Sequence, residues 1–423
     1  MVALGEDGVV GGAHPTAEVA VAYLQSPQAI RDRCRALFAL AKQDRLQHFR
    51  YHADALPAAA DYVLAVMRQQ YPDGDVPFHS RWRHFEVEGR SRLERLDPAL
   101  SALDSLEQAR LKVDLAITSV LLDAGAGSQW RYVEPGTGLG FARSEGLAIA
   151  SFHAFTAGLC SSQPEHPWQA DASGLTALTA NSLAQAFQVN DNNLLLGVEG
   201  RVALLQKLGH ALHQQPKFFG ADLPRPGHLV DYWLTQATDN ALSAPTILQT
   251  ILQGLGPIWP GRVELARVNL GDVWPHPQLP ETGPGSNLVP FHKLSQWLTY
   301  SLLEPLQDLG LKITDLDQLT GLAEYRNGGL FIDCGVLSLK DPAAQAIAHP
   351  PSSPLIVEWR ALTLCLLDDL AAHLRQTLDM NAETLPLVKI LQGGTWTAGR
   401  QIAAEKRTDG GPPIQLASDG TVF

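Results

Sequence analysis

The sequence predicts a mainly α protein that folds as a single helical globule with a few short strands, and it leaves open a division into two lobes around a cleft. Apolar residues recur at helical spacing in much of the chain, whereas strand-like stretches are few. With 423 residues, 45% of them hydrophobic and 18% charged, the chain can bury one large core or two moderate ones. We find no repeat and no domain linker, so we expect a flexible glycine-rich N-terminus (1–13), one helical domain (14–408) and a C-terminal tail (409–423).

The helices begin at recognisable signals. A polar residue that can cap a helix is followed by proline at Ser26-Pro27, Asp97-Pro98 and Asp341-Pro342, and proline is well suited to the first helical position. The apolar periodicity then predicts helices, in chain order, over residues 29–42, 57–70, 106–122, 147–159, 196–213, 228–253, 289–309, 355–378 and 384–391. Strands are expected mainly over residues 330–339, with weaker support over residues 263–268.

Charge and cysteine usage limit the partners and the compartment. A net charge of -12 argues against a nucleic-acid partner, because phosphate contacts require a positive surface, although a local arginine cluster could still hold a small anion. The four cysteines form no CxxC pair, and we expect reduced, mostly buried thiols. No apolar run reaches the length of a membrane span and no signal pattern is recognisable, so we expect a cytoplasmic protein without a membrane partner. The oligomeric state is left open.

Residues 319–333 contain the densest group of functional side chains. Carboxylate, phenol, guanidinium and amide groups follow one another there: Glu324, Tyr325, Arg326, Asn327 and, after two glycines, Asp333. If Gly328-Gly329 forces a bend, with Asp333 on a short strand after it, these side chains can be directed into a cavity. The alternative is a helix C-terminus with a glycine cap and ordinary surface charges.

The helix expected over residues 289–309 has polar and aromatic side chains beside an apolar face. Phe291, Leu294, Leu298 and Leu302 recur at helical spacing. The adjoining faces carry His292, Lys293, Gln296, Trp297, Thr299, Tyr300 and Glu304. A helix that borders a pocket explains this mixture. The alternative is a lysine whose stem lies along apolar surface and a core histidine with a satisfied hydrogen bond.

Two clusters could bind an anion. Arg81 and Arg83, in a loop with aromatic neighbours, could hold a phosphate or carboxylate, or could pair with surface acids. Around residue 394, two glycines are expected to end one helix and Thr395 to cap the next, leaving N–H groups that could bind an anion.

Residues 143–145 precede an apolar helix. Ser144 is a plausible N-cap and Glu145 suits the first helical turn, so capping alone explains both residues. Capping does not explain Arg143. The fourteen histidines form no HExxH or His-x-His pair, so we favour structural roles for them and expect no metal. A Gly-x-Ser-x-Gly nucleophile motif is also absent.

Four blocks of this sequence resemble a known family. They read RSEGL (143–147), PFHKLSQWL (290–298), TGLAEYRNGG (320–329) and GGTWTAGR (393–400). These blocks are similar to those of the uracil-catabolism protein four family, also called Urg-three and long filed as a domain of unknown function. The likeness extends from about residue 23 to residue 400. It implies a place in a pyrimidine-degradation route whose proposed intermediate is a ribosylated urea.

A second resemblance implies a mechanism. FHKLSQ (291–296) followed by AEY (323–325) is similar to the order Phe-Tyr-Lys-x-x-Gln and Ala-Asp-Tyr in queuosine salvage nucleosidases, which have a helical fold akin to DNA glycosylases. In that family the acid before the tyrosine is the catalytic carboxylate. The resemblance therefore implies that role for Glu324, although this chain has glutamate where that family has aspartate, and it suggests a DNA-glycosylase-like core.

These resemblances imply a hydrolase that cleaves an N-ribosyl bond of a uracil-degradation intermediate such as ribosylurea or its phosphate. A carboxylate would stabilise the oxocarbenium-like transition state. We predict Glu324, Tyr325, Lys293 and Asp333 as the catalytic residues. The predicted substrate-binding residues are His292, Gln296, Arg326, Asn327, Arg81 and Arg83, together with Arg143 and Glu145, which the first resemblance implies, with a structural role for Arg326 as the alternative. No cofactor is expected. Two other hypotheses stay open, a metal-dependent amidohydrolase or deaminase acting on an opened pyrimidine, and a non-catalytic partner in the same pathway.

Overall fold

The computed structural model describes residues 15–96, 100–123, 125–127 and 129–417, and it confirms a mainly α fold. The longer helices are α1 (Ala17–Leu24), α2 (Pro27–Lys42), α3 (Leu56–Gln70), α5 (Ser105–Leu121), α6 (Arg143–Thr156), α9 (Val198–Gln214), α11 (Leu229–Gln236), α12 (Ala244–Gly254), α13 (Lys293–Asp308), α14 (Tyr325–Asp333), α15 (Pro354–Leu378) and α17 (Trp396–Lys406). The shorter helices are α7 (Ala172–Ala177), α8 (Ala180–Ala186), α10 (Pro216–Phe219) and α16 (Leu387–Ile390).

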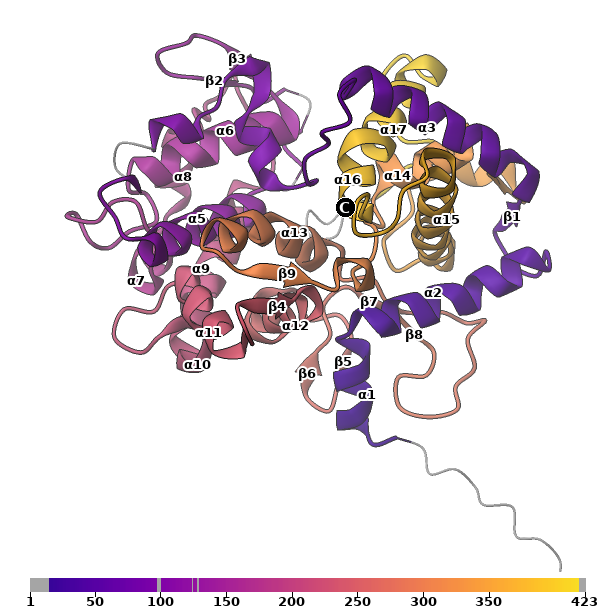
Figure 1. Cartoon of the computed structure of the whole chain (residues 1–423), viewed down its shortest axis with the longest axis horizontal. Helices are drawn as coiled ribbons and strands as arrows, with labels where there is room; N and C mark the ends of the chain where they lie inside the picture. Colours follow the sequence, from indigo (N-terminus) through magenta and orange to yellow (C-terminus); the bar gives the residue numbers. More distant parts are fainter. Residues whose placement is uncertain (1–14, 97–99, 124, 128, 418–423) are drawn as a thin grey trace, which may run out of the picture.

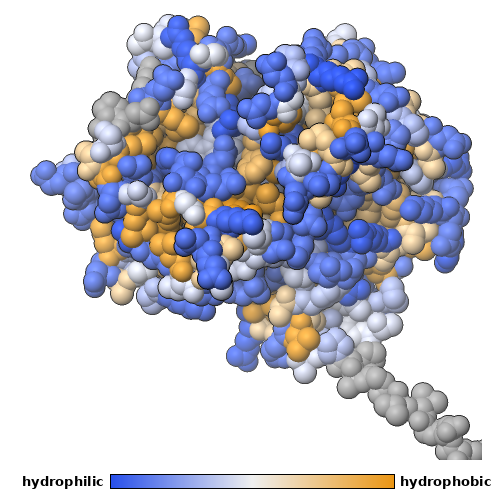
Figure 2. Space-filling model, in the orientation of Figure 1, coloured by the Kyte–Doolittle hydropathy of each residue, from blue (hydrophilic) through white to orange (hydrophobic). Residues whose placement is uncertain are grey.

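Helix α13 lies between two groups of helices (Figure 1). One group contains α5 to α12, of which α5 and α12 pack directly against α13. The other contains α2, α3 and α14 to α17, with α15 packed against α2, α3 and α14. Figure 2 shows apolar side chains in the hollow between the groups and mostly hydrophilic side chains on the outer rim. The candidate site lies where these groups meet.

The strands are short and form only two-stranded ladders within the described residues. The antiparallel pairs are β1 (Phe49–Tyr51) with β10 (Leu337–Leu339), β2 (Tyr132–Val133) with β3 (Gly140–Phe141), β5 (Glu264–Leu265) with β6 (Val268–Asn269), and β7 (Val273–Pro275) with β8 (Leu288–Pro290). The parallel pair is β4 (Ala241–Ser243) with β9 (Lys312–Thr314). These ladders fasten loops to the helical core.

Most of the predicted helices are confirmed, as α2, α3, α5, α6, α9 and α15. Ser26 caps α2 as expected, because its Oγ accepts the backbone N–H of Ala29 at 3.2 Å. Asp341 caps a short helical turn by accepting the N–H of Ala343 at 3.0 Å. The predicted cap at Asp97-Pro98 lies outside the described residues. Ser144 is not a cap, because α6 begins at Arg143 and its N-cap residue is Ala142.

The single helix predicted over residues 228–253 is wrong. Two helices, α11 and α12, flank the strand β4. Asp239 and Asn240 have φ values of 50° and 58°, a left-handed conformation that ends a helix, and Pro245 occupies the start of α12. Apolar residues continue at helical spacing across the break, so periodicity alone could not reveal it. The helix predicted from residue 289 also starts too early, since residues 288–290 form β8.

The strand predicted over residues 330–339 and the bend predicted at Gly328-Gly329 are also wrong. Residues 325–333 form α14, both glycines lie inside it, and only residues 337–339 form a strand. The glycines are there for close packing. A Cβ on Gly328 would lie 2.8 Å from Trp359 Nε1 and 2.8 Å from Thr363 Oγ1, both on α15. Glycine thus lets two helices approach closely, and its flexibility is not used.

Two further predictions fail in detail. The helix expected over residues 384–391 is shorter, and a π-helical turn (Leu391–Thr395) carries the chain directly from α16 into α17, so Thr395 caps nothing. A Cβ on Gly394 would lie 2.5 Å from Val63, which again points to close packing. The strand expected over residues 263–268 is a hairpin, with Ala266 and Arg267 in left-handed turn positions between β5 and β6.

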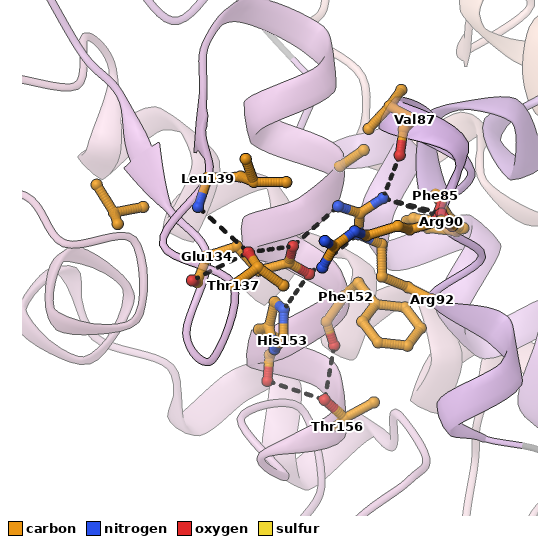
Figure 3. Close-up of polar contacts among 12 residues, drawn as sticks. Phe85, Val87, Arg90, Arg92, Glu134, Thr137, Leu139, Phe152, His153 and Thr156 are labelled. Atoms are coloured by element: carbon orange, nitrogen blue, oxygen red, sulfur yellow. Dashed lines mark hydrogen bonds and ion pairs between the residues drawn. The ribbon is translucent and has the colours of Figure 1, made fainter.

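A buried charged network fastens the β2–β3 hairpin to α6 (Figure 3). The carboxylate of Glu134 accepts hydrogen bonds from Arg92 Nε at 3.0 Å and Nη2 at 2.8 Å, from Thr137 Oγ1 at 3.0 Å, and contacts His153 Nε2 at 3.1 Å. Arg92 also donates to the carbonyl oxygen of Val87 at 2.7 Å. Burial raises the pKa of Glu134, but the hydrogen bonds from Arg92 and His153 outweigh it and bring this pKa to about 2.

The four cysteines are free, and all except the partly buried Cys334 are buried, as expected. The longest helix, α15, has 25 residues, but charged side chains interrupt its apolar sequence. Within the described ranges, none of the helices combines the length and the apolar character that crossing a membrane requires.

Candidate active site

A pocket of about 510 Å³ lies at the junction of the two helix groups. Its walls come from separate parts of the chain: His79 and His84, Asp123, Gly125 to Gly127, Arg143 and Ser144, Lys293, Leu294 and Trp297, Leu322, Glu324 to Arg326, Trp396, and Asp409 to Pro412. A pocket of this size can enclose a nucleoside-sized molecule. It mixes charged, aromatic and backbone groups, which is the composition expected of a site that orients a polar ligand.

Glu324 is placed by the helix that follows it. It is the N-cap of α14, and its carboxylate accepts the backbone N–H of Asn327 at 2.6 Å and of Arg326 at 2.9 Å. The alternative considered for this segment, a helix C-terminus, is wrong, because the structure shows a helix start, where a negative charge is favourable. Burial raises the pKa of Glu324 above its usual range, despite these hydrogen bonds and the nearby charge of Lys293.

Lys293 approaches the same pocket from the first position of α13. Burial lowers the pKa of its ammonium group, and the negative charge of Glu324 opposes this shift only in part. Among the described residues, no side chain forms a hydrogen bond or ion pair with Lys293 Nζ. A carboxyl group with a raised pKa and an ammonium group with a lowered pKa thus line one pocket, which is typical of proton-transfer sites.

A buried ion pair beneath the pocket supports both residues. Asp272 accepts hydrogen bonds from Arg360 Nη1 and Nη2, each at 2.7 Å, and from the backbone N–H of Lys293 at 3.0 Å. Arg360 Nε donates to the carbonyl oxygen of Ala323, next to Glu324, at 3.2 Å. Burial raises the pKa of Asp272, but Arg360 lowers it far more, so this carboxylate stays charged. Sequence analysis did not place this pair in the site, and Arg360 lies inside a long apolar helix.

The neighbours of Glu324 divide between the pocket and the core. Tyr325 and Arg326 line the pocket, and Arg326 Nη1 donates to the carbonyl oxygen of Gly410 at 2.7 Å. The guanidinium of Arg326 also lies 4.9 Å from the centre of the Tyr325 ring. Asn327 is buried behind the wall, where its Nδ2 donates to the carbonyl oxygen of Leu322 at 3.1 Å. Arg326 thus holds residues 409–412 against the pocket.

Asp333, Gln296 and His292, which were predicted for the site, do not line this pocket. Asp333 is at the far end of α14, not on a strand, and binds Arg407 through contacts of 2.7 and 2.6 Å. Gln296 is fully buried in the core side of α13. His292 lies just before α13, with its Nε2 2.9 Å from the carbonyl oxygen of Leu24. The structure therefore separates these side chains from Glu324.

The two loop arginines are engaged by carboxylates. Arg81 is fully buried, with its Nη1 2.8 Å from Asp123 Oδ2 and its Nε 2.7 Å from Ser119 Oγ. Arg83 forms ion pairs with Glu304 at 2.7 Å and Glu86 at 3.0 Å. Of the two predictions for these arginines, the structure therefore has the second, in which they pair with acidic side chains. Neither guanidinium is placed as a free anion-binding group.

Arg143 and Glu145 lie at the edge of the site. Arg143 lines the pocket, is exposed, and has a left-handed φ of 53°, which is rare for a residue with a side chain. No ion pair of Arg143 is found among the described residues. Glu145 does not line the pocket, and its carboxylate lies 3.4 Å from Arg400. Of this pair, only Arg143 can reach a ligand in the pocket directly.

Sequence reasoning missed the aromatic and imidazole wall of the pocket. The ring of Trp396 lies 5.9 Å from that of His79 and 6.2 Å from that of His84, measured between centroids. Trp297 contacts His84 edge-on at 5.8 Å. Both histidines are at least nine-tenths buried, since 6% of His79 and 9% of His84 are exposed. Their sequence neighbours gave one signal, the RWRHF segment (81–85), but nothing in the sequence linked it to Trp396.

No group of three or more His, Cys, Asp or Glu side chains suited to a metal ion occurs in the part of the chain that the structure describes. Asp272 and His276, which are four residues apart, have other partners. Asp272 binds Arg360, and His276 Nε2 lies 3.6 Å from Glu358 Oε1.

Comparison with known proteins gives a consistent assignment. The family model described as "Protein of unknown function (DUF1688)" matches residues 23–423. Protein urg3 of Schizosaccharomyces pombe is 41% identical over 413 residues, covering 95% of this chain and 99% of that protein. Uracil catabolism protein 4 of Lachancea kluyveri is 38% identical over 442 residues, covering 96% of this chain and 100% of that protein. The chain therefore belongs to the DUF1688 family, together with these two relatives.

Proposed function

We propose that the protein acts in uracil catabolism as a hydrolase of an N-ribosyl bond, with ribosylurea or its phosphate as substrate. The name of the Lachancea kluyveri relative supports the pathway. The observation that carries the proposed reaction is the placement of Glu324, a partly buried carboxylate at a helix start, in one pocket with Lys293. This pair has the two groups that hydrolysis of an N-glycosidic bond requires.

In the proposed reaction the bond between C1′ and the urea nitrogen breaks, and its electron pair goes to nitrogen. The sugar ring gains positive charge, which the carboxylate of Glu324 stabilises. A water molecule adds to C1′ and gives a proton to Glu324. The ammonium of Lys293 gives a proton to the departing nitrogen, and the proton on Glu324 later returns to Lys293 by way of solvent. The sum is the addition of one water molecule, with free sugar and urea as products.

The environment suits these roles. The two backbone hydrogen bonds of Glu324 fix the direction of its carboxylate before substrate binds. Its raised pKa makes it a better base than a solvated carboxylate, and the lowered pKa of Lys293 makes it a better acid than a solvated ammonium. Tyr325 is positioned to contact the sugar from the same wall. If the sugar is phosphorylated, Arg143 is the exposed cation at the pocket that can bind the phosphate.

The test is to incubate purified, metal-analysed protein with ribosylurea and with its 5′-phosphate and to measure released urea and free sugar. We expect release without metal, and a loss of about 100- to 10,000-fold in kcat for Glu324→Gln. Glutamine can still accept the N–H of Asn327 through its amide oxygen, so this cap bond is retained, whereas the bond from the N–H of Arg326 is lost. A matched control is Asp333→Asn on the same helix, which should keep kcat within about threefold once folding is checked.

Each other outcome has a meaning. Normal turnover by folded Glu324→Gln would overturn the proposed mechanism. Release of ammonia from an opened pyrimidine, together with bound zinc or manganese, would favour the amidohydrolase. If wild type and Glu324→Gln both bind ribosylurea tightly and neither turns it over, the non-catalytic role is favoured.

A further inference from the structure

The two pocket histidines each have one ring nitrogen bound to a buried protein group. His84 Nδ1 lies 3.3 Å from Arg81 Nη1, and His79 Nδ1 lies 2.9 Å from Gln392 Oε1. For the other nitrogen of each ring, the described residues supply no hydrogen-bond partner. Since both residues line the pocket, their Nε2 atoms are available to a ligand.

The partner of His84 determines its tautomer. A guanidinium group only donates hydrogen bonds, so His84 Nδ1 must accept and must carry no proton. In the neutral ring the proton is then on Nε2, which becomes a donor. Arg81 cannot easily turn away, because Asp123 binds its Nη1 at 2.8 Å and Ser119 Oγ binds its Nε at 2.7 Å. His84 therefore presents an N–H group to the pocket.

The partner of His79 determines the opposite tautomer. Gln392 Nε2 donates to the hydroxyl of Tyr71 at 3.1 Å, which leaves its Oε1 toward the imidazole. An amide oxygen only accepts, so His79 Nδ1 carries the proton and Nε2 has a free lone pair. His79 therefore presents an acceptor to the pocket, beside the donor of His84.

Both rings stay neutral at physiological pH. Burial lowers the pKa of His79 to about 4, although its bond to Gln392 opposes the shift. Burial also holds the pKa of His84 well below its usual range, and the charges of Arg81 and Arg400 lower it further. A neutral donor and a neutral acceptor match a neutral planar ligand better than an ion.

We propose that His84 and His79 are specificity-determining residues that bind the two sides of a urea-type group, with His84 Nε2–H donating to its carbonyl oxygen and His79 Nε2 accepting from its N–H. The Nε1–H of Trp297, which has no hydrogen-bond partner among the described residues, is a second donor for that oxygen. The ring of Trp396, close to both imidazoles, offers a flat surface for a planar group. The identification of this group as the urea leaving group rests on the proposed function.

Asparagine and glutamine substitutions at each histidine distinguish an effect on ligand binding from an effect on folding. In His84→Asn the shorter amide can still accept from Arg81 but leaves nothing at the position of Nε2. In His84→Gln the longer amide restores a donor near Nε2 but loses the contact with Arg81. At position 79, asparagine keeps the bond to Gln392 and glutamine keeps a polar group near Nε2. Thermal unfolding and circular dichroism identify any variant that is not folded.

We expect each asparagine variant to raise the KM for ribosylurea, and its Kd in the Glu324→Gln background, by about 3- to 10-fold, the effect of one lost neutral hydrogen bond. Each glutamine variant should restore part of this loss. Inhibition by ribose, which lacks the urea group, should be unchanged. Equal KM values for wild type and both asparagine variants, or an equal weakening of ribose inhibition, would overturn the inference while leaving the hydrolase function intact.

A separate measurement tests the inference if the proposed function fails. If the wild-type protein releases no urea from ribosylurea, binding of N-methylurea is followed by saturation-transfer NMR. Binding that is weakened in the asparagine variants and kept in the glutamine variants would sustain the inference. No binding to wild type, or equal binding to all variants, would overturn it.

Discussion

Asp272 and Arg360 form a bidentate pair, with both contacts at 2.7 Å, beneath the helix starts that carry Lys293 and Glu324. The pair reaches both of them, because Asp272 accepts the N–H of Lys293 and Arg360 donates to the carbonyl oxygen of Ala323. Two segments about thirty residues apart in the chain are thereby held in a fixed relation. For the proposed reaction, Asp272 and Arg360 act as positioning residues, since neither lines the pocket.

Removing one member of this pair should damage both stability and activity. Asp272→Asn removes the carboxylate charge that accepts two hydrogen bonds of 2.7 Å from the buried guanidinium of Arg360, and we expect a loss of about 3 to 5 kcal/mol in the free energy of unfolding. We also expect kcat to fall more than KM rises, because the catalytic groups lose their mutual placement. Urea denaturation and steady-state kinetics measure the two effects. The double variant Asp272→Asn/Arg360→Met should regain stability but not kcat, and recovery of both would contradict the positioning role.

The plot of kcat/KM against pH should be bell-shaped, with its acid limb at a higher pH and its alkaline limb at a lower pH than solvated groups would give. The acid limb reports protonation of Glu324 and should lie above the range of a solvated carboxyl group, because burial raises the pKa of Glu324. The alkaline limb reports loss of the proton from Lys293 and should lie below the range of a solvated lysine. Residual activity of Glu324→Gln should lack the acid limb. Persistence of that limb in the variant would assign it to another group.

Gly328→Ala should disturb the site from inside α14. The added Cβ would meet Trp359 and Thr363 at 2.8 Å, so α14 must shift away from α15. We expect a loss of about 1 to 3 kcal/mol in stability, together with a lower kcat because Glu324 caps the shifted helix. Gly200→Ala is the matched control, since a Cβ on Gly200 in α9 meets nothing within 4 Å. Alanine there should be neutral or stabilising by up to about 1 kcal/mol. Equal thermal stability of the two variants would show that α14 tolerates the methyl group.

Acid should lower the free energy of unfolding by protonating Glu134. The pKa of this carboxyl is lowered from 4.5 to about 2 in the folded protein, so the folded state binds its proton less readily than the unfolded chain. Its contribution is therefore present above pH 4.5 and is lost as the pH falls toward 2, and it amounts to on the order of 3 kcal/mol. Denaturant titrations of wild type and Glu134→Gln at several pH values measure this. The stability difference between them should shrink as the pH falls, and a difference independent of pH would contradict the assignment.

The sequence predicted the helices best where one face is apolar throughout, as in α2, α3 and α15. It failed where the signal depends on distant contacts. The strand β4 exists because β9 pairs with it, some seventy residues later, and no local pattern in residues 241–243 announces this. Gly328 was read as a bend because glycine permits one, whereas its role is set by Trp359 on another helix.

The candidate site was predictable only in part, again because part of the signal depends on distant contacts. Glu324 and Lys293 lie in dense polar segments, and both line the pocket. Asp333 was grouped with them on the assumption of a strand, and the helix turns it toward Arg407 instead. His79 lies in a segment with few other signals. It becomes visible as a site residue only when Gln392, from the opposite end of the chain, is placed against it.

The walls of the pocket come from residues as far apart as His79 and Pro412, with Arg326 holding Gly410 in place. A chain still emerging from the ribosome can form α2, α3 and α5 early, yet it lacks this last wall until residues 409–412 have been synthesised. The proposed activity should therefore be gained only when this wall is in place. A truncated or partly degraded chain would keep much of its helical content and lose its activity, so turnover is a stricter measure of intact protein than circular dichroism.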